Sequence, residues 1–324
     1  MSDLPRVSVV VPTCRRPELL DRCLAALAAQ DLDPAGYEVV VADDGHCPAT
    51  RGVVACWAAR APAVVRYVPV TCGRGPAAAR NAGWRAARGV VVAFTDDDCQ
   101  PTPDWLARGL AGFVDGVQGV SGRVLVPLGT SPTDYEWNAA GLERSTFVTA
   151  SCFYRRSALA AAGGLDERFE QAWREDTDLY FTLLERGARL EVAPDAVVVH
   201  PVRPAAWGIS LRQQRKSMYN ALLYKKHPAL YRERVQSEPP WGYYATVAAL
   251  VAASALGVTG RRRPALAGAL AWLVLTTRFC ARRLDGTSRA PAHVAEMAVT
   301  SALIPPLAVF WRLRGALRFR VRLL

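Results

Sequence analysis

The C-terminal part of the sequence has very few acidic residues. Residues 201–324 hold 4 Asp+Glu against 20 Lys+Arg, a local net charge of +16, whereas residues 1–200 hold 25 acidic and 20 basic residues and carry −5. The basic part is also rich in apolar runs, and it has no DNA- or RNA-binding signature. We therefore expect it to contact an anionic membrane surface and no nucleic acid.

The 8 cysteines include no C-x-x-C pair and no zinc-like spacing. A chain of 324 residues can bury a substantial core without cross-links, so these cysteines are expected to be reduced, mostly packed thiols. The opening residues, Met1-Ser2-Asp3-Leu4-Pro5-Arg6, show no signal peptide. Both observations predict a cytoplasmic catalytic part.

Strand-like and helix-like segments alternate through the first 125 residues. The expected strands are 7–11, 37–42, 64–70 and 90–94, and the expected helices are 17–30, 49–60 and 76–88. This order predicts an α/β fold with a mostly parallel sheet and helices on both faces. Further on, the pattern predicts strands at 120–127, 146–154 and 190–199, and helices at 157–163 and 176–186.

Beyond residue 205 the sequence predicts a helical appendage. We expect a catalytic domain over 1–205, a basic helical linker over 206–238 and an apolar, basic, membrane-associated region over 239–324. Pro239–Gly260 has no charged residue and is long enough to cross a bilayer at about 1.5 Å per residue. Pro264–Thr277 is marginal as a span, and Met297–Trp311 is interrupted by two prolines.

The orientation of this region stays open. If Pro239–Gly260 crossed outward from a cytoplasmic domain, Arg261-Arg262-Arg263 would lie outside, against the positive-inside rule. A helical hairpin that enters only the cytoplasmic leaflet would avoid this conflict. The third possibility is a helical appendage that packs on the catalytic domain.

Three consecutive acids, Asp96-Asp97-Asp98, follow the apolar run 89–93. Carboxylates this close repel one another, and burial adds to their cost. Mg²⁺ or Mn²⁺ would supply the missing positive charge and prefers oxygen ligands. The alternative is a solvated acidic turn. Asp98, Asp96 and His200 are the candidate metal ligands, although His200 could equally have a structural role.

The other predicted strands of the first half also end in polar residues. Because parallel strands end along one edge of a sheet, these residues are expected to converge on a nucleotide. Asp43 would accept a hydrogen bond from a ring N–H of the base, or it could instead only form a turn. Arg80 would bind a phosphate, or it could instead only lie on a helix surface. The candidates for nucleotide-sugar binding are Pro12, Thr13, Arg15, Asp43, Asp44, Arg80, Asp96 and Asp97.

A second group of polar residues precedes the helix predicted at 176–186. Asp176 is the candidate general base for an acceptor hydroxyl, and Glu175 is the rival for that role. The alternative for Asp176 is a helix cap. Trp173 and Trp105 are candidates for stacking on a sugar ring, and Trp173 could instead belong to the core.

Together, these motifs resemble those of the inverting family-2 glycosyltransferases of the GT-A fold. The resemblance covers roughly residues 5–200 and rests on six motifs in order: Val7-Ser8-Val9-Val10-Val11-Pro12-Thr13, Val41-Ala42-Asp43-Asp44-Gly45, Ala79-Arg80-Asn81-Ala82-Gly83, Asp96-Asp97-Asp98, Gly163-Gly164-Leu165-Asp166-Glu167-Arg168-Phe169 and Glu175-Asp176-Thr177-Asp178-Leu179. The chain departs from the family pattern at Ser151, where Asn is frequent, and in Tyr180-Phe181-Thr182, which lacks a frequent Arg.

The resemblance implies a GT-A-like (Rossmann-like) catalytic domain and particular residue roles. Asp43 corresponds to the residue that reads the nucleobase, Asp96 and Asp98 to the D-x-D motif, and Asp176 to the catalytic base. The implied reaction is metal-dependent, inverting transfer from a nucleoside-diphosphate sugar to a hydroxyl of a membrane-linked glycan or lipid acceptor, of the cell-envelope polysaccharide type. The expected location is the cytoplasmic face of the plasma membrane.

Other functions remain as alternatives. The segment Gly73-x-Gly75-x-x-Ala78 fits a dinucleotide-binding loop, with Asp96 about 20 residues further on, and would suit an NAD(P)-dependent oxidoreductase. Against this, the loop follows the third strand, and Asp97 and Asp98 would crowd an anionic cofactor. A nucleotidyltransferase would need a Gly-rich loop with a Lys near the N-terminus. A catalytically dead membrane scaffold is disfavoured by the intact Asp98 and Asp176.

Overall fold

The computed structural model describes residues 4–322 and divides into two compact units. The first unit comprises the chain up to Pro127 together with Ala140–Val202, and the second comprises Leu128–Ala139 and the chain from Arg203 onward. We had predicted a single boundary at residue 205. In the structure the segment Leu128–Ala139 also belongs to the second unit, although it lies within the predicted catalytic domain.

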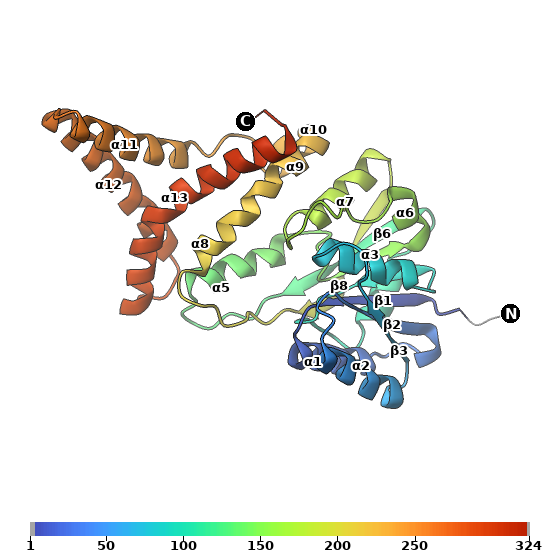
Figure 1. Ribbon diagram of the computed structural model, residues 1–324. Helices are drawn as coiled ribbons and strands as arrows, with labels where there is room; N and C mark the ends of the chain where they lie inside the picture. Colours follow the sequence, from blue (N-terminus) through green and yellow to red (C-terminus); the bar gives the residue numbers. More distant parts are fainter. Residues whose placement is uncertain (1–3, 323–324) are drawn as a thin grey trace. The chain divides into compact units, whose positions relative to one another are not determined.

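A mixed sheet forms the centre of the first unit (Figure 1). Among the described residues its strand order is β3-β2-β1-β4-β7-β6-β8-β5. β1 to β4 are parallel to one another, β7 is antiparallel to both β4 and β6, and β8 is parallel to β6. The strands are β1 (Val7–Thr13), β2 (Tyr37–Asp43), β3 (Val64–Pro69), β4 (Val91–Phe94), β5 (Gln100–Pro101), β6 (Val117–Leu125), β7 (Cys152–Arg155) and β8 (Arg189–Val199).

The central strands are apolar runs, and β1, β2 and β4 are buried along their whole length. Such continuous burial is typical of a sheet covered on both faces. The flanking helices are α1 (Pro17–Ala28), α2 (Pro48–Arg60), α3 (Pro76–Ala86), α4 (Trp105–Ala111), α6 (Arg156–Ala162) and α7 (Glu175–Glu185). The first three each begin with proline, whose fixed φ and missing N–H suit the first helical position. This architecture confirms the predicted fold class.

One local prediction was wrong, and two elements were missed. The strand predicted over 146–154 begins only at Cys152, because Phe147 has a φ of 56° and its N–H donates to the Ser121 hydroxyl, which forms a turn. The short strand β5 and helix α4 were not predicted. Neither has a distinctive period in the sequence.

The second unit is helical. It contains α5 (Asp134–Ala139), α8 (Ile209–Gln213), α9 (Tyr219–Lys226), α10 (Pro228–Arg234), α11 (Trp241–Val258), α12 (Arg262–Leu284) and α13 (Pro291–Phe319). The range predicted as a basic helical linker, 206–238, contains α8, a 3₁₀ turn at Gln214–Met218, α9 and α10. By length and composition, α11, α12 and α13 could each cross a membrane.

Helices α11 and α12 pack side by side as a hairpin (Figure 1). They approach closely at Gly268, where a Cβ would lie 3.0 Å from the backbone nitrogen of Ala253. Apart from this contact the hairpin is almost entirely exposed: α11 buries only Thr246, and α12 buries only Thr276 and Leu284. Apolar side chains therefore cover its surface.

Candidate active site

The acids after β4 lie beside the end of β1, because these two parallel strands are paired in the sheet. Asp97 is buried between them. Its carboxylate accepts from the Thr13 hydroxyl at 2.8 Å and from Arg16 at 3.1 Å. Burial raises the pKa of Asp97 to about 6, and Arg16 and Thr13 oppose that rise. Asp97 thus links two strand ends internally, and its contact with a nucleotide stays a prediction.

Arg80 comes from α3 and is almost completely buried, with 3% of its side chain exposed. Its guanidinium donates to Asp96 at 2.6 Å and to Glu175 at 2.9 Å. It therefore joins the acid cluster after β4 to the first turn of α7. We had expected Arg80 to meet a phosphate. In the structure its charge is instead taken by two carboxylates.

Glu175 and Asp176 begin α7, immediately after Arg174, whose φ of 77° turns the chain into the helix. Glu175 is buried against Arg80, and its second oxygen has no partner in the described part of the chain. Burial raises the pKa of Glu175 to about 7, the charge of Asp176 adds to the rise, and Arg80 opposes it. Asp176 is partly exposed and accepts from the N–H of Thr177 at 2.6 Å. Of the two acids, Asp176 is the one that a substrate hydroxyl can reach.

Asp98, Cys99 and His200 form the candidate metal cluster. A ligand atom of each lies within 4.8 Å of the others, and His200 Nε2 is 3.5 Å from Asp98 Oδ1. Burial raises the pKa of the Cys99 thiol well above its usual range, so it stays protonated. The remaining oxygen and imidazole donors fit a dication such as Mn²⁺ or Mg²⁺. The buried His200 Nδ1 has no partner among the described residues.

Asp43 has the structural role that was the alternative in the sequence. Its side chain is fully buried and accepts from the N–H groups of Gly45 and Cys47, at 2.8 and 3.0 Å, and from the Tyr67 hydroxyl at 2.9 Å. These bonds build the turn after β2, and direct reading of a base by Asp43 stays a prediction. Its neighbour Asp44 is partly exposed and accepts from the N–H of Gly75 at 2.8 Å.

The remaining candidates divide into buried and exposed residues. Pro12 and Thr13 are buried in β1, whereas Arg15 is exposed with a φ of 56°. Trp105 is fully buried, with its indole N–H on the Ser151 hydroxyl at 3.0 Å, so its predicted stacking on a sugar was wrong. Trp173 is 39% exposed, and the Arg174 guanidinium lies 4.8 Å from its ring centroid.

The glycine loop after β3 is largely exposed, but both of its glycines approach another segment closely. A Cβ on Gly73 would lie 2.6 Å from a carboxylate oxygen of Glu167, and one on Gly75 would collide with the carbonyl of Glu170. The loop also follows the edge strand β3 and not a strand at the centre of the sheet. The glycines thus allow close packing of the chain on itself, which removes the observation that favoured an oxidoreductase.

Sequence reasoning missed two participants in the site. Arg16 was not among the predicted site residues, yet it pairs with Asp97. Cys99 was grouped with the packed thiols, yet it lies beside Asp98 and His200. The position of Cys99 directly after the acids was the available signal.

Two family models match the chain. One is described as Glycosyl transferase family 2 and covers residues 8–159. The other is described as Glycosyl transferase family group 2 and covers residues 91–311, which is more than half of the chain. The chain belongs to glycosyltransferase family 2. The predicted family and enzyme class are therefore confirmed.

Several curated relatives of this glycosyltransferase share moderate identity. Glycosyltransferase AglE of Haloferax volcanii is 28% identical over 225 residues, which are 66% of this chain and 72% of the relative. Succinoglycan biosynthesis protein ExoM of Rhizobium meliloti is 29% identical over 241 residues, 68% of this chain and 76% of the relative. The pre-mycofactocin glycosyltransferase of Mycobacterium tuberculosis is 32% identical, over 61% of this chain but only 43% of the relative.

Solved structures share the fold of this glycosyltransferase. Mannosyltransferase PcManGT from Pyrobaculum calidifontis, in complex with GDP-Man and Mn²⁺, has a TM-score of 0.63 and 22% identity over 96% of this chain and 87% of that chain. TarS 1-349 of S. aureus, in complex with UDP-GlcNAc, has a TM-score of 0.52 and 16% identity, over 95% and 92% of the two chains. These similarities confirm the GT-A-like fold.

Proposed function

We propose that this glycosyltransferase is metal-dependent and inverting, and that it transfers a sugar from a nucleoside-diphosphate sugar to a hydroxyl of a membrane-linked glycan or lipid acceptor. One observation carries the proposal. Through Arg80, the acid cluster after β4 is joined to the helix that begins with Glu175 and Asp176. A cation site and a candidate base are thereby held at one edge of the sheet.

Asp98 and His200, with Asp96 beside them, would hold the dication. When bound, such an ion offsets the negative charge that develops on the leaving nucleoside diphosphate. Arg80 keeps Asp96 in place, and Asp97 fixes the end of β4 to β1. The two solved structures in complex with GDP-Man and with UDP-GlcNAc support the class of donor, but these donors differ in base and sugar.

Asp176 is proposed as the general base. Its carboxylate would take the proton of the acceptor hydroxyl as that oxygen attacks the anomeric carbon. Attack from the side opposite the leaving group inverts the anomeric centre. Glu175 is enclosed by Arg80 and carries a raised pKa, so its proposed role is to position Arg80 rather than to contact the acceptor. Trp173 remains our candidate for stacking on a sugar.

The second unit is proposed to hold the enzyme at the cytoplasmic face of the plasma membrane. Three apolar helices and a strong excess of arginine support this location. Two relatives named for succinoglycan biosynthesis, ExoM and ExoO, support an acceptor in the cell envelope.

The test is a nucleotide-release assay with a panel of GDP- and UDP-sugars, in the presence of Mn²⁺ or after exhaustive chelation. We expect release only with the cation, and we expect Asp98→Asn to lose metal-dependent donor binding. The matched control is Asp104→Asn, an exposed acid paired with Arg108 on the surface of the first unit, which should behave like the parent. Equal activity after chelation would refute the metal role.

A further inference from the structure

The two faces of α13 have different surroundings. One face is buried within the second unit, at Met297, Ser301, Ile304, Ala308 and Gly315. The opposite face carries an outer stripe of exposed apolar residues, namely Val299, Leu303, Phe310, Leu313 and Leu317. The two sets are offset by two residues along the helix, which places them about 200° apart around its axis. The outer stripe is both exposed and apolar, so water alone is a poor environment for it.

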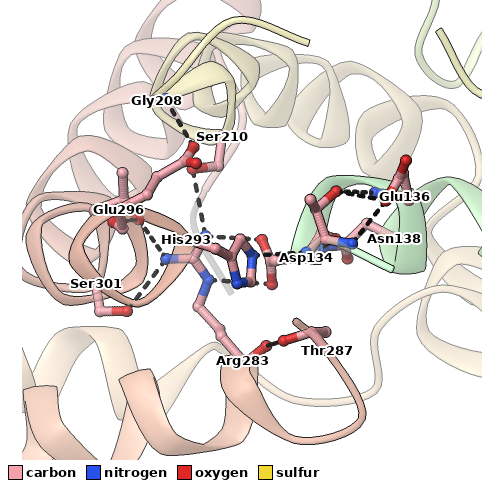
Figure 2. Close-up of polar contacts among 12 residues, drawn as sticks. Asp134, Glu136, Asn138, Gly208, Ser210, Arg283, Thr287, His293, Glu296 and Ser301 are labelled. Carbon is pink, nitrogen blue, oxygen red and sulfur yellow. Dashed lines mark hydrogen bonds and ion pairs between the residues drawn. The ribbon is translucent and has the colours of Figure 1, made fainter. Parts of the chain in front are cut away.

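The first half of α13 is fixed by polar contacts (Figure 2). Arg283, from the last turn of α12, donates to Asp134 of α5 at 2.8 Å and to Thr300 of α13 at 2.7 Å. The ion pair between Arg283 and Asp134 is buried, with each side chain 8% exposed. His293 accepts from the backbone N–H of Asp134 at 3.0 Å, and Glu296 from that of Gly208 at 2.7 Å.

The second half of α13 packs on the short basic helices of the same unit. Gly315 lies directly on the Met218 backbone, where a Cβ would collide with the Met218 carbonyl. Lys225 donates to the carbonyl of Phe319 at 2.8 Å, and Arg312 donates to Gln236 at 3.2 Å. The inner face is therefore bound to charged and polar segments along the whole helix.

These contacts argue against α13 as a membrane span. A spanning α13 would carry Arg283, Asp134 and the exposed non-helical backbone near residue 130 into the hydrocarbon, where charges are costly and lipid-exposed irregular backbone does not occur. In addition, Pro305 and Pro306 lie inside α13, which bends (Figure 1). Each half is about 20 Å long, less than the roughly 30 Å of a bilayer core.

We propose that α13 lies in the plane of an anionic bilayer surface with its outer stripe in the lipid, while only the α11–α12 hairpin enters more deeply. The sequence has no acidic residue after Glu296, and the exposed Arg314 and Arg318 alternate with the outer stripe. This combination of an apolar stripe and cations suits acyl chains below and anionic phosphate headgroups beside the helix. The inference rests on the membrane association in the proposed function and adds its geometry.

The test measures how deep each residue of the outer stripe lies. The full chain is bound to vesicles of phosphatidylcholine and phosphatidylglycerol, and a fluorophore is attached through an unnatural amino acid, because the chain has 8 native cysteines. Five variants carry the label at residues 299, 303, 310, 313 and 317, and lipids with quenchers at known depths report its position. Two reference variants carry it at Val64, exposed in the first unit, and at Leu270, exposed on the hairpin.

We expect all five stripe labels at one shallow depth, the label at 270 deeper and the label at 64 unquenched. A spanning helix would instead separate residues 299 and 317 by about 27 Å along the bilayer normal. A steady change of depth along the stripe, or five labels in water, would overturn the inference while leaving membrane association intact. No binding to the vesicles would remove the membrane part of the proposed function as well. Nucleotide release in the same samples reports whether the catalytic unit is intact.

Discussion

The two units of this glycosyltransferase differ in how much apolar side chain they expose. In the first unit, apolar strands fill the interior and the ionisable groups gather at one edge of the sheet. In the second unit, the ion pair between Arg283 and Asp134 is inside, and leucines and valines such as Leu270 and Val274 are outside. A surface with so many exposed apolar side chains is typical of a protein that binds a membrane or another protein.

Each unit contains a buried arginine that pairs with carboxylates, but the partners of the two arginines differ. Arg80 lies between two carboxylates at the proposed active site. Arg283 pairs with one carboxylate and also donates to hydroxyls of Thr300 and Ser301. The first arrangement concentrates negative charge where a cation would bind, and the second neutralises charge within a helical unit. The following predictions test this contrast.

The largest expected effect belongs to the edge of the first unit. Asp176→Asn should reduce transfer by about 10²–10⁴-fold, because it removes the proposed proton acceptor. Donor binding and vesicle binding should stay unchanged. Transfer is measured by product-nucleotide release with an acceptor, and donor binding by calorimetry. Weaker donor binding would instead assign Asp176 to the donor site.

Removal of Arg80 should have the largest effect on stability. Arg80→Leu leaves Asp96 and Glu175 without their shared cation, and we expect a loss of about 5 kcal/mol in the free energy of unfolding. The matched control is Arg85→Leu on the same helix, which breaks a more exposed 3.5 Å pair with Glu167 and should cost less than about 1 kcal/mol. Chemical denaturation followed by near-UV circular dichroism measures both. Equal costs for the two variants would contradict the bridging role.

Removal of the buried arginine of the second unit should lower the free energy of unfolding by less, and a second substitution should restore part of the loss. Arg283→Leu leaves a single carboxylate, Asp134, buried and unpaired, and we expect a loss of about 3 kcal/mol. Adding Asp134→Leu should restore part of it, since no buried charge then remains. A double-mutant cycle on the unfolding free energies measures this coupling. Additive losses would show that the two side chains act independently.

The smallest effect concerns pH. The pKa of Glu175 rises from 4.5 to about 7 on folding, so between these pH values the folded chain binds more protons than the unfolded chain. Its contribution to the free energy of unfolding should therefore decline as pH rises through this window. Glu175→Gln should lack this component of the slope. Unfolding titrations of both proteins in the presence of a chelator measure the difference, and identical slopes would exclude it.

The sequence predicted where the functional groups converge, because buried strands and their polar ends are local features. The acids after β4, Thr13 at the end of β1 and the start of α7 all lie at the expected positions in the fold. Hydrophobic periodicity likewise predicted the helix at 17–30, which is present as α1 and buries Leu20, Cys23, Leu24 and Leu27.

The partners of these groups could not be predicted. Whether Asp43 meets a base or its own turn depends on Tyr67 and Cys47, which reach it only in the folded chain. Trp105 is buried because Ser151 supplies an acceptor for its indole N–H from a segment 46 residues away. Likewise, no local pattern shows that Leu128–Ala139 belongs with helices that follow it by about 70 residues or more.

The placement of Leu128–Ala139 in the second unit affects how the two units can be separated or fused to other proteins. The chain passes between the units three times, after Pro127, after Ala139 and after Val202. A cut at residue 205 would leave Asp134 without Arg283 and would deprive the helical part of α5. The helical unit is therefore not a separate segment that can be exchanged by a single cut, and a chimaera that replaces it must also replace the twelve-residue insert.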